Sequence, residues 1–255
     1  MTPTKRKTIY KCHVGSIAHN LYVAPSMDKE FGTCDKDYME FYVYDKDYYL
    51  GLDGYHRRGD TFELKKGDVD LVGHELRKAF DLMLKGNPNI LVTLFNDPSN
   101  YIELTDGAKM ILHNRSLFLS ARNMKMRFAG YAYSQLHRMQ KAEYAGYMGK
   151  KRKAIVDKYG YDTKNAMTLV RLLQEGIELL KTGKLVIYKT GTTRDFLLDI
   201  KRAKFTLKEV QEMADNLFAD LDKAYSESVL PELLNGRKIN KLLIDILDIE
   251  VFSKP

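Results

Sequence analysis

Two kinds of apolar pattern divide the chain near residue 110, and this division limits the folds that it can adopt. The N-terminal part carries runs of β-branched and aromatic residues in Thr8–Val14, in Met39–Asp45 and in the shorter stretches TFELKK and DVDLV. Such runs, bounded by Gly or Asp, are typical of strands. A helical repeat over Gly73–Gly86 and a second helix expected from Pro88 follow them. Residues 1–110 are therefore predicted to form a small mixed β-sheet with helices.

The remainder of the chain has the pattern of an almost wholly helical segment. The stretch 163–183 repeats apolar residues at helical spacing and ends at Gly183, where a glycine can terminate a helix. The stretch 206–225 opens with a capping box, Thr206 followed by Glu209, and then continues with an apolar stripe. Together the two parts predict an α+β fold in which a mostly helical domain, residues 111–255, follows the sheet domain.

The charge of the chain indicates polyanionic partners, and its cysteine content indicates a reducing compartment. The 255 residues carry a formal net charge of +7, which favours polyanionic partners such as nucleic acid or nucleotide phosphates. Cys12 and Cys34 lack the CxxC spacing of a zinc or redox site and are interpreted as free thiols in a reducing compartment. No long apolar stretch follows the basic N-terminal segment, so we expect no membrane span and a cytoplasmic protein.

A Gly-Ser pair near the N-terminus precedes a closely spaced pair of aspartates. Gly15 and Ser16 follow the first predicted strand, where a glycine lets the backbone approach a phosphate closely. Asp35 and Asp37 lead into the next strand, whose alternation would place both carboxylates on one face. Carboxylate and phosphate oxygens are the ligands that Mg²⁺ prefers. This arrangement is consistent with binding of a magnesium nucleotide.

A third acidic residue is then expected on a neighbouring strand. Asp68 and Asp70 share one face of the stretch DVDLV, and either could reach the aspartate pair. The sequence DKDY occurs a second time, which makes Asp45 and Asp47 a rival pair. That pair lies at the far end of the strand and is interpreted as the start of a solvated turn.

Several blocks together resemble a known family. They are DLVGHELRKAF, LMLKGNPNILVTLF, FAGYAYSQLHRM and YGYDTKNAMTLVRLLQEGIELLKTGKL, and they lie within residues 10 to 225. In this order they resemble the DNA polymerase β-like nucleotidyltransferase superfamily, and within it the predicted nucleotidyltransferases of bacteria and phages labelled YcgL or RlaP. The resemblance implies transfer of a nucleoside monophosphate from a nucleoside triphosphate, such as ATP, to an acceptor hydroxyl, with release of pyrophosphate.

The resemblance also implies roles for individual residues. Gly15 and Ser16 would bind the triphosphate, and Asp35 and Asp37 would bridge two Mg²⁺ ions, for which Mn²⁺ can substitute. Asp70 would be the third metal ligand and would draw the proton from the acceptor. The basic residues with a possible role in binding nucleotide or acceptor phosphates are Arg77, Lys78, Lys164 and Arg171. The alternative for these four is an ordinary position on a solvated helix face.

Two departures from the family pattern bear on substrate choice. The spacer from Ile17 to Cys34 is longer than usual, as if a loop had been inserted, and Lys36 stands where a hydrophobic residue is more common.

An RNA or DNA 3′ end is the acceptor that best suits the basic balance, and a protein or a small molecule is also possible. Nucleic acid could bind basic helical segments, either residues 149–153 or a track with the residues Arg122, Lys125, Arg127, Arg138 and Lys141. The alternative class is a non-catalytic nucleic-acid or partner-binding protein that keeps the nucleotidyltransferase fold. A phage-encoded protein would act in the host cytoplasm.

Overall fold

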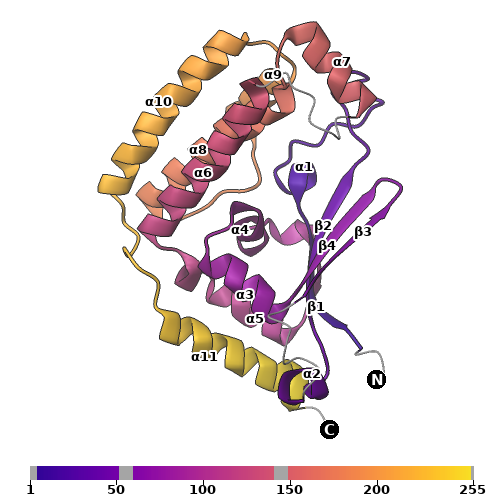
Figure 1. Cartoon of the computed structure of the whole chain (residues 1–255), viewed down its shortest axis with the longest axis vertical. Coiled ribbons are helices and arrows are strands. Elements are labelled where there is room, and N and C mark those ends of the chain that lie inside the picture. Colours follow the sequence, from indigo (N-terminus) through magenta and orange to yellow (C-terminus); the bar gives the residue numbers. More distant parts are fainter. Residues whose placement is uncertain (1–4, 52–59, 141–148, 254–255) are drawn as a thin grey trace. The chain divides into compact units, whose positions relative to one another are not determined.

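The computed structural model describes residues 5–51, 60–140 and 149–253 (Figure 1). The chain divides into two compact units, each built from segments that are distant in sequence. The first, here called the sheet unit, comprises Met1–His19, Asp35–Leu119 and Leu234–Pro255. The second, here called the helical unit, comprises Asn20–Cys34 and Ser120–Leu233.

The sheet unit is built on five strands. They are β1 (Lys7–His13), β2 (Lys36–Val43), β3 (Thr61–Lys66), β4 (Val69–Glu75) and β5 (Tyr101–Leu104). Their order in the sheet is β3-β4-β2-β1-β5. The central pair, β2 and β4, is parallel, whereas the other neighbours are antiparallel. The sheet is therefore mixed, and its two central parallel strands begin at the same edge.

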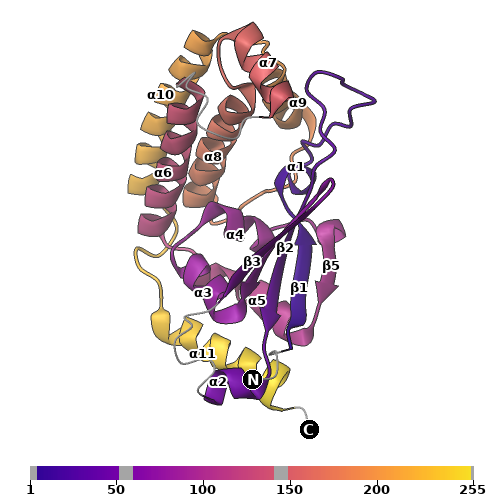
Figure 2. The ribbon, with the colours of Figure 1, turned by 45° about the vertical axis from the view of Figure 1, so that its right-hand side comes forward.

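The sheet unit also contains the helices α1 (Gly15–Ala18), α2 (Lys46–Leu50), α3 (Leu76–Leu84), α4 (Pro88–Leu94), α5 (Asp106–His113) and α11 (Gly236–Leu247). Of these, α3 packs against β2 and β4 on one face of the sheet (Figure 2). Tyr10 of β1 stacks on Phe41 of β2 with ring centroids 4.7 Å apart, and both rings are fully buried. Phe80 and Met83 of α3 are buried as well. The core thus forms between the aromatic face of the strands and the apolar stripes of the helices.

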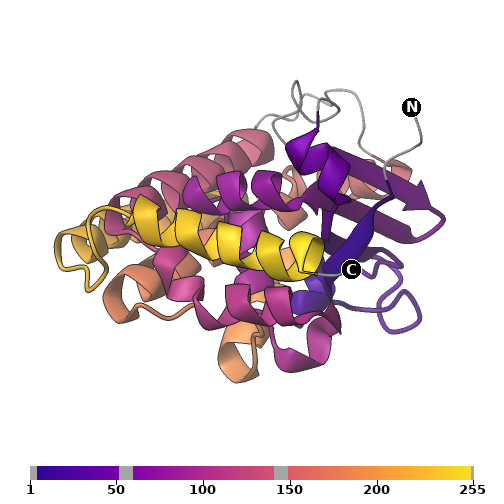
Figure 3. The ribbon, with the colours of Figure 1, turned by 90° about the horizontal axis from the view of Figure 1, so that it is seen from below.

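The C-terminal segment belongs to the sheet unit, with α11 beside α5 (Figure 3). Glu250, in the π-helical turn Asp248–Phe252, accepts a hydrogen bond from the backbone amide of Gly107 at 3.0 Å and pairs with Lys7. Burial alone would raise the pKa of Glu250, but the hydrogen bonds from Lys7, Thr105 and Gly107 lower it. A buried carboxylate therefore fastens the end of the chain to β1 and α5.

The described residues of the helical unit form five helices. They are α6 (Ala121–Gln140), α7 (Lys150–Tyr159), α8 (Thr163–Thr182), α9 (Gly191–Lys201) and α10 (Leu207–Ser226). Helix α8 packs against α6, α9 and α10. Gly176 permits the close approach of α6, because a Cβ atom there would lie 2.9 Å from the Cβ of Phe128. Helix α8 is accordingly the central element of this unit.

The segment Asn20–Cys34 contains the stretch that looked like an insertion, and it is fastened to the helical unit by polar contacts. Its bonds run from Lys151 Nζ to the carbonyl of Gly32 (2.6 Å) and from Arg202 Nε to Asp28 Oδ2 (3.1 Å). Farther along, Lys158 Nζ donates to Glu30 Oε1 (2.8 Å). The segment is therefore an integral part of the helical unit.

The structure confirms the predicted α+β class and most elements. Helix α8 ends at Gly183 in the left-handed region, and α10 begins with the expected capping box of Thr206 and Glu209. Cys12 and Cys34 are free thiols, as predicted.

Three details differ from the sequence predictions. Gly73–Glu75 extends β4 instead of opening the next helix, because β2 pairs with this stretch and α3 begins only at Leu76. Strand β5 was not predicted, since its four residues have no buried side chain. Asp45 is the N-cap of the short helix α2, which replaces the turn expected there.

Candidate active site

The turn after β1 places Gly15 against Asp37. The backbone amide of Val14 donates to the carbonyl of Asp37 at 2.9 Å, so the pairing of β1 and β2 continues beyond His13. Gly15 then takes a φ of 61°, and a Cβ atom at this position would lie 2.1 Å from Asp37 Oδ2. The carboxylate of Asp37 therefore occupies the space that glycine leaves open.

A buried histidine closes this turn. His19 has an exposed fraction of 4%, and its Nδ1 lies 2.8 Å from the carbonyl oxygen of Gly15. Ser16 is half-buried in the first turn of α1, next to Gly15. A hydrogen-bonded structural role for His19 agrees with its place beside the Gly-Ser pair in the sequence, although no motif indicates that the carbonyl of Gly15 is its partner.

Asp37 and Asp70 lie directly opposite each other on the central strands. The parallel register of β2 and β4 pairs these two residues, so their side chains point to the same face at the strand separation of about 4.8 Å. Both residues are half-buried. Adjacent carboxylates repel each other, and a cation between them relieves this repulsion. The two side chains form the centre of the candidate site and are here called the aspartate pair.

The other two candidate acids lie at the edge of this arrangement. Asp35 precedes β2 and Asp68 lies in the turn before β4, and both are exposed. The amide of Lys36 donates to the carbonyl of Asp68 at 2.7 Å, which fixes the start of both strands. Within the described ranges, no group of three or more His, Cys, Asp and Glu side chains is placed to hold a metal ion. The structure thus brings Asp70 to Asp37, but it does not gather Asp35 into a three-carboxylate group.

Arg77 lies near the opposite end of β4 from the aspartate pair. Five residues separate Asp70 from Glu75, which corresponds to about 16 Å along a strand. Glu75 caps α3 by accepting from the amide of Arg77 at 3.1 Å, and the guanidinium of Arg77 lies 5.0 and 4.9 Å from the rings of Tyr48 and Tyr49. These contacts hold Arg77 beside α2, far from Asp70.

Lys78 lies beside two other titratable residues. Its Nζ is 3.8 Å from Asp81 Oδ2, and both of these α3 residues are half-buried. Burial and the charge of Lys78 lower the pKa of His74 to about 4, so the ring of His74 is neutral at pH 7. The Nδ1 of this ring lies 2.9 Å from the hydroxyl of Thr61.

Lys164 and Arg171 both lie on α8, in the helical unit, and their surroundings differ. Lys164 is exposed in the first turn of the helix, whose N-cap is Asp162. The side chain of Arg171 is 12% exposed, and its Nη1 bonds to Glu175 Oε2 at 2.8 Å. Arg171 is therefore engaged in a buried ion pair, whereas Lys164 faces solvent.

Helix α6 is amphipathic, with arginines on its exposed face and apolar residues on its buried face. Arg122, Arg127 and Arg138 are exposed, while Met124 and Phe128 are buried. Lys125 pairs with Asp222 of α10 at 3.0 Å. Lys141 lies outside the described residues. The exposed arginines of α6 remain available to a polyanion.

Comparison with known families assigns this chain to the polymerase β-like nucleotidyltransferases. The Gly-Ser turn beside paired carboxylates, on a mixed sheet with helices, agrees with this class. The chain belongs to the RlaP family, described as the RNA repair pathway DNA polymerase beta family, whose model matches residues 2–245. The family resemblance carried by the sequence blocks is thereby confirmed.

Other comparisons add little to this assignment. Among solved structures, a nucleotidyltransferase-like protein from Exiguobacterium sibiricum 255-15 aligns over 98% of this chain and 76% of its own, with 10% sequence identity and a TM-score of 0.29. A similarity of this size supports no conclusion about the site. No curated protein sequence matches the chain. Within the described residues, no helix has the length and apolar character needed to cross a membrane.

The absence of a side chain at Gly15 leads to a direct prediction. Gly15→Ala would place a methyl group on the carboxylate of Asp37 and strain a backbone with φ of 61°. We expect a loss of stability of about 1–2 kcal/mol from the left-handed backbone, measured by urea denaturation. Nucleotide transfer should fall as well, since Asp37 must move. Gly67→Ala is the matched control, because Gly67 has a φ of 57° and no atom near its missing Cβ. Equal transfer in the two variants would show that the contact with Asp37 is unimportant.

Proposed function

We propose that this chain transfers a nucleoside monophosphate from a nucleoside triphosphate to an acceptor hydroxyl and releases pyrophosphate. The observation that carries the proposal is the aspartate pair, which the register of two parallel strands holds beside the Gly-Ser turn. Membership of a polymerase β-like family agrees with this chemistry.

The donor set suits magnesium. Asp37 and Asp70 offer hard carboxylate oxygens on one face of the sheet, and their mutual repulsion would be relieved by a divalent cation. Asp35, which the structure does not gather with this pair, is proposed to join them as a third ligand when the ion binds. When bound, Mg²⁺ lowers the pKa of an attacking hydroxyl and neutralises charge on the leaving phosphates.

The protein's own groups would position the reactants. Gly15 and Ser16 would bind the triphosphate through backbone amides and a hydroxyl, and Asp70 would take the proton from the acceptor. An RNA 3′ end is the proposed acceptor, because the family is described by RNA repair and the net charge of +7 favours a polyanion. The exposed arginines of α6 are candidates for its phosphates.

A labelling experiment tests the proposal. The purified protein is incubated with Mg²⁺ or Mn²⁺ and each of the four α-labelled nucleoside triphosphates, with and without total cellular RNA. A variant carrying Asp37→Asn and Asp70→Asn serves as the matched control. Label should enter RNA with the wild-type chain and be absent with the variant. Label in the protein itself would instead identify a protein acceptor. Failure to transfer in every reaction, with RNA still bound, would replace the proposal by the non-catalytic nucleic-acid-binding alternative.

A further inference from the structure

Lys201, the last residue of α9, is mostly buried and has no counter-ion in direct contact, and its ammonium nitrogen still reaches solvent. Its exposed fraction is 8%. Within the described residues, its ammonium group has neither a carboxylate at ion-pair distance nor a hydrogen bond. Burial of an uncompensated charge is costly, so such a lysine needs a reason to be retained.

The groups whose charges act on Lys201 are mostly cationic and come from several elements of the helical unit. Lys151 of α7, Lys164 of α8 and Arg202 all act on its charge, and Asp28 is the single acid among them. Burial and then the charges of Lys164, Lys151 and Arg202 lower the pKa of Lys201 to about 8 despite Asp28. The ammonium group is thus destabilised where it stands.

Asp28 pairs with Arg202 and bonds to none of the three lysines, so it neutralises only part of this group of cations. Arg202 Nε donates to its Oδ2 at 3.1 Å, and the amide of Phe31 donates to its Oδ1 at 3.0 Å. Lys151 Nζ is held by the carbonyl of Gly32 at 2.6 Å, which fixes its position beside the cluster. Lys201, Lys164 and Lys151, here called the lysine cluster, therefore present positive charge in a partly fixed arrangement.

We propose that the lysine cluster is a binding site for the phosphate groups of a small polyphosphate, either a nucleoside triphosphate or pyrophosphate. An anion would supply the counter-charge that Lys201 lacks and would accept hydrogen bonds from the ammonium groups. The proposal depends on the proposed function in one respect: the bound polyphosphate is the donor or the product of a reaction only if the protein transfers nucleotides. A long nucleic-acid backbone fits less well, because so little of Lys201 is exposed.

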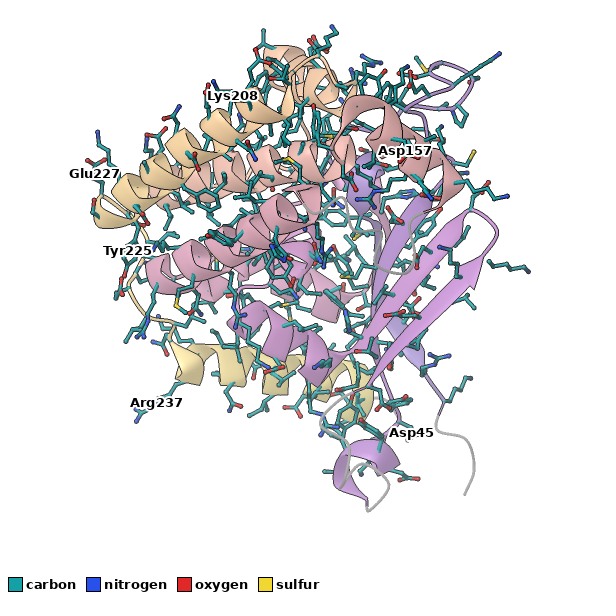
Figure 4. The ribbon with its side chains drawn as sticks, turned by 45° about the horizontal axis from the view of Figure 1, so that its top comes forward. Asp45, Asp157, Lys208, Tyr225, Glu227 and Arg237 are labelled. Atoms are coloured by element: carbon teal, nitrogen blue, oxygen red, sulfur yellow. The ribbon has the colours of Figure 1, made fainter. Side chains whose placement is uncertain are left out.

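The test compares Lys201→Met with a matched lysine variant of the same unit. Lys208 of α10 (labelled in Figure 4) has a side chain that is 86% exposed, and Lys208→Met removes the same charge away from the cluster. Inorganic tripolyphosphate is titrated into each protein without metal and followed by calorimetry. Lys201→Met should lower the affinity by at least about tenfold, whereas Lys208→Met should leave it unchanged. Equal affinities in the wild type and Lys201→Met would overturn the site.

Thermal unfolding separates loss of binding from loss of folding. Without ligand, Lys201→Met should melt at a higher temperature than the wild type, because a buried charge among other cations is removed. A variant that melts lower would contradict the inferred environment of Lys201.

Two further arms identify the source of the phosphate. ATP and pyrophosphate should show the same dependence on Lys201 as tripolyphosphate, since they share its chemistry. If Lys201→Met instead weakened binding of a single-stranded RNA oligonucleotide and spared tripolyphosphate, the polyphosphate site would be refuted. The titration of tripolyphosphate contains no metal and measures no transfer, so the site can stand even if the proposed transfer fails.

Discussion

Replacing Asp37 by asparagine is expected to lower nucleotide transfer by more than about 100-fold, with little change in melting temperature. Residues that only support a metal ligand cost up to about 100-fold when mutated, and a direct ligand should cost more. The fold should persist because asparagine has the same shape and removes one of two facing negative charges. Transfer is measured with α-labelled nucleotide under single-turnover conditions, and the melting temperature by circular dichroism.

The repeated sequence DKDY provides a matched control for this variant. Asp47 occupies the same place in the second copy as Asp37 does in the first, but it is exposed in α2 (Figure 4 labels its neighbour Asp45). Asp47→Asn should retain full transfer, while Asp70→Asn should lose as much as Asp37→Asn. Near-normal turnover by Asp37→Asn would refute the aspartate pair as the catalytic centre. Asp35→Asn in the same assay tests the proposed third ligand, which should also lose most of its activity.

Local signals in the sequence predicted most of the elements correctly. The capping box at Thr206 and the glycine at position 183 bound their helices because caps and terminators act within one helical turn. The end of β4 was missed, since Gly73–Glu75 is held in strand form by pairing with β2, more than thirty residues earlier. The same non-local register places Asp70, instead of Asp68, opposite Asp37. Alternation along a strand could not decide between these two residues, because it assigns both of them to the same face.

Contacts between distant segments account for the rest of what the sequence did not show. The spacer before Asp35 looked like an inserted loop, yet Asp28 and Gly32 bind residues that follow them by more than a hundred positions. Lys201 carries no signal either, because a lysine in the last turn of a helix is ordinary. Its character follows from burial and from the cations that other helices bring near it.

Arg171, which the sequence predicts to bind substrate phosphates, also takes part in a buried group of ion pairs. Glu175 is 2% exposed, and its two oxygens lie 2.8 Å from Arg171 Nη1 and 3.2 Å from Lys189 Nζ. The side chain of Lys189 is 7% exposed, and its carbonyl accepts from Asn20 Nδ2 at 2.9 Å. One buried carboxylate thus links α8 to the segment before α9.

Removing that carboxylate should destabilise the protein strongly. Glu175→Ala would leave two buried cations without their shared partner, and we expect a loss of about 3–5 kcal/mol in the free energy of unfolding. The measurement is urea denaturation followed by circular dichroism. Glu178→Ala, three residues farther along the same helix, removes an equal charge from a partly exposed position and should cost less than about 1 kcal/mol. Similar losses for the two variants would contradict the importance of the buried group.

A triple variant then separates stability from activity at Arg171. Replacing Arg171, Glu175 and Lys189 together by leucine removes every charge of the group, and such replacements of buried ion pairs are often neutral or stabilising. The triple variant should therefore recover most of the stability that Glu175→Ala loses. If Arg171 serves only the fold, nucleotide transfer recovers with it. If transfer stays low in a stable triple variant, Arg171 also contacts a substrate, as the family resemblance implied.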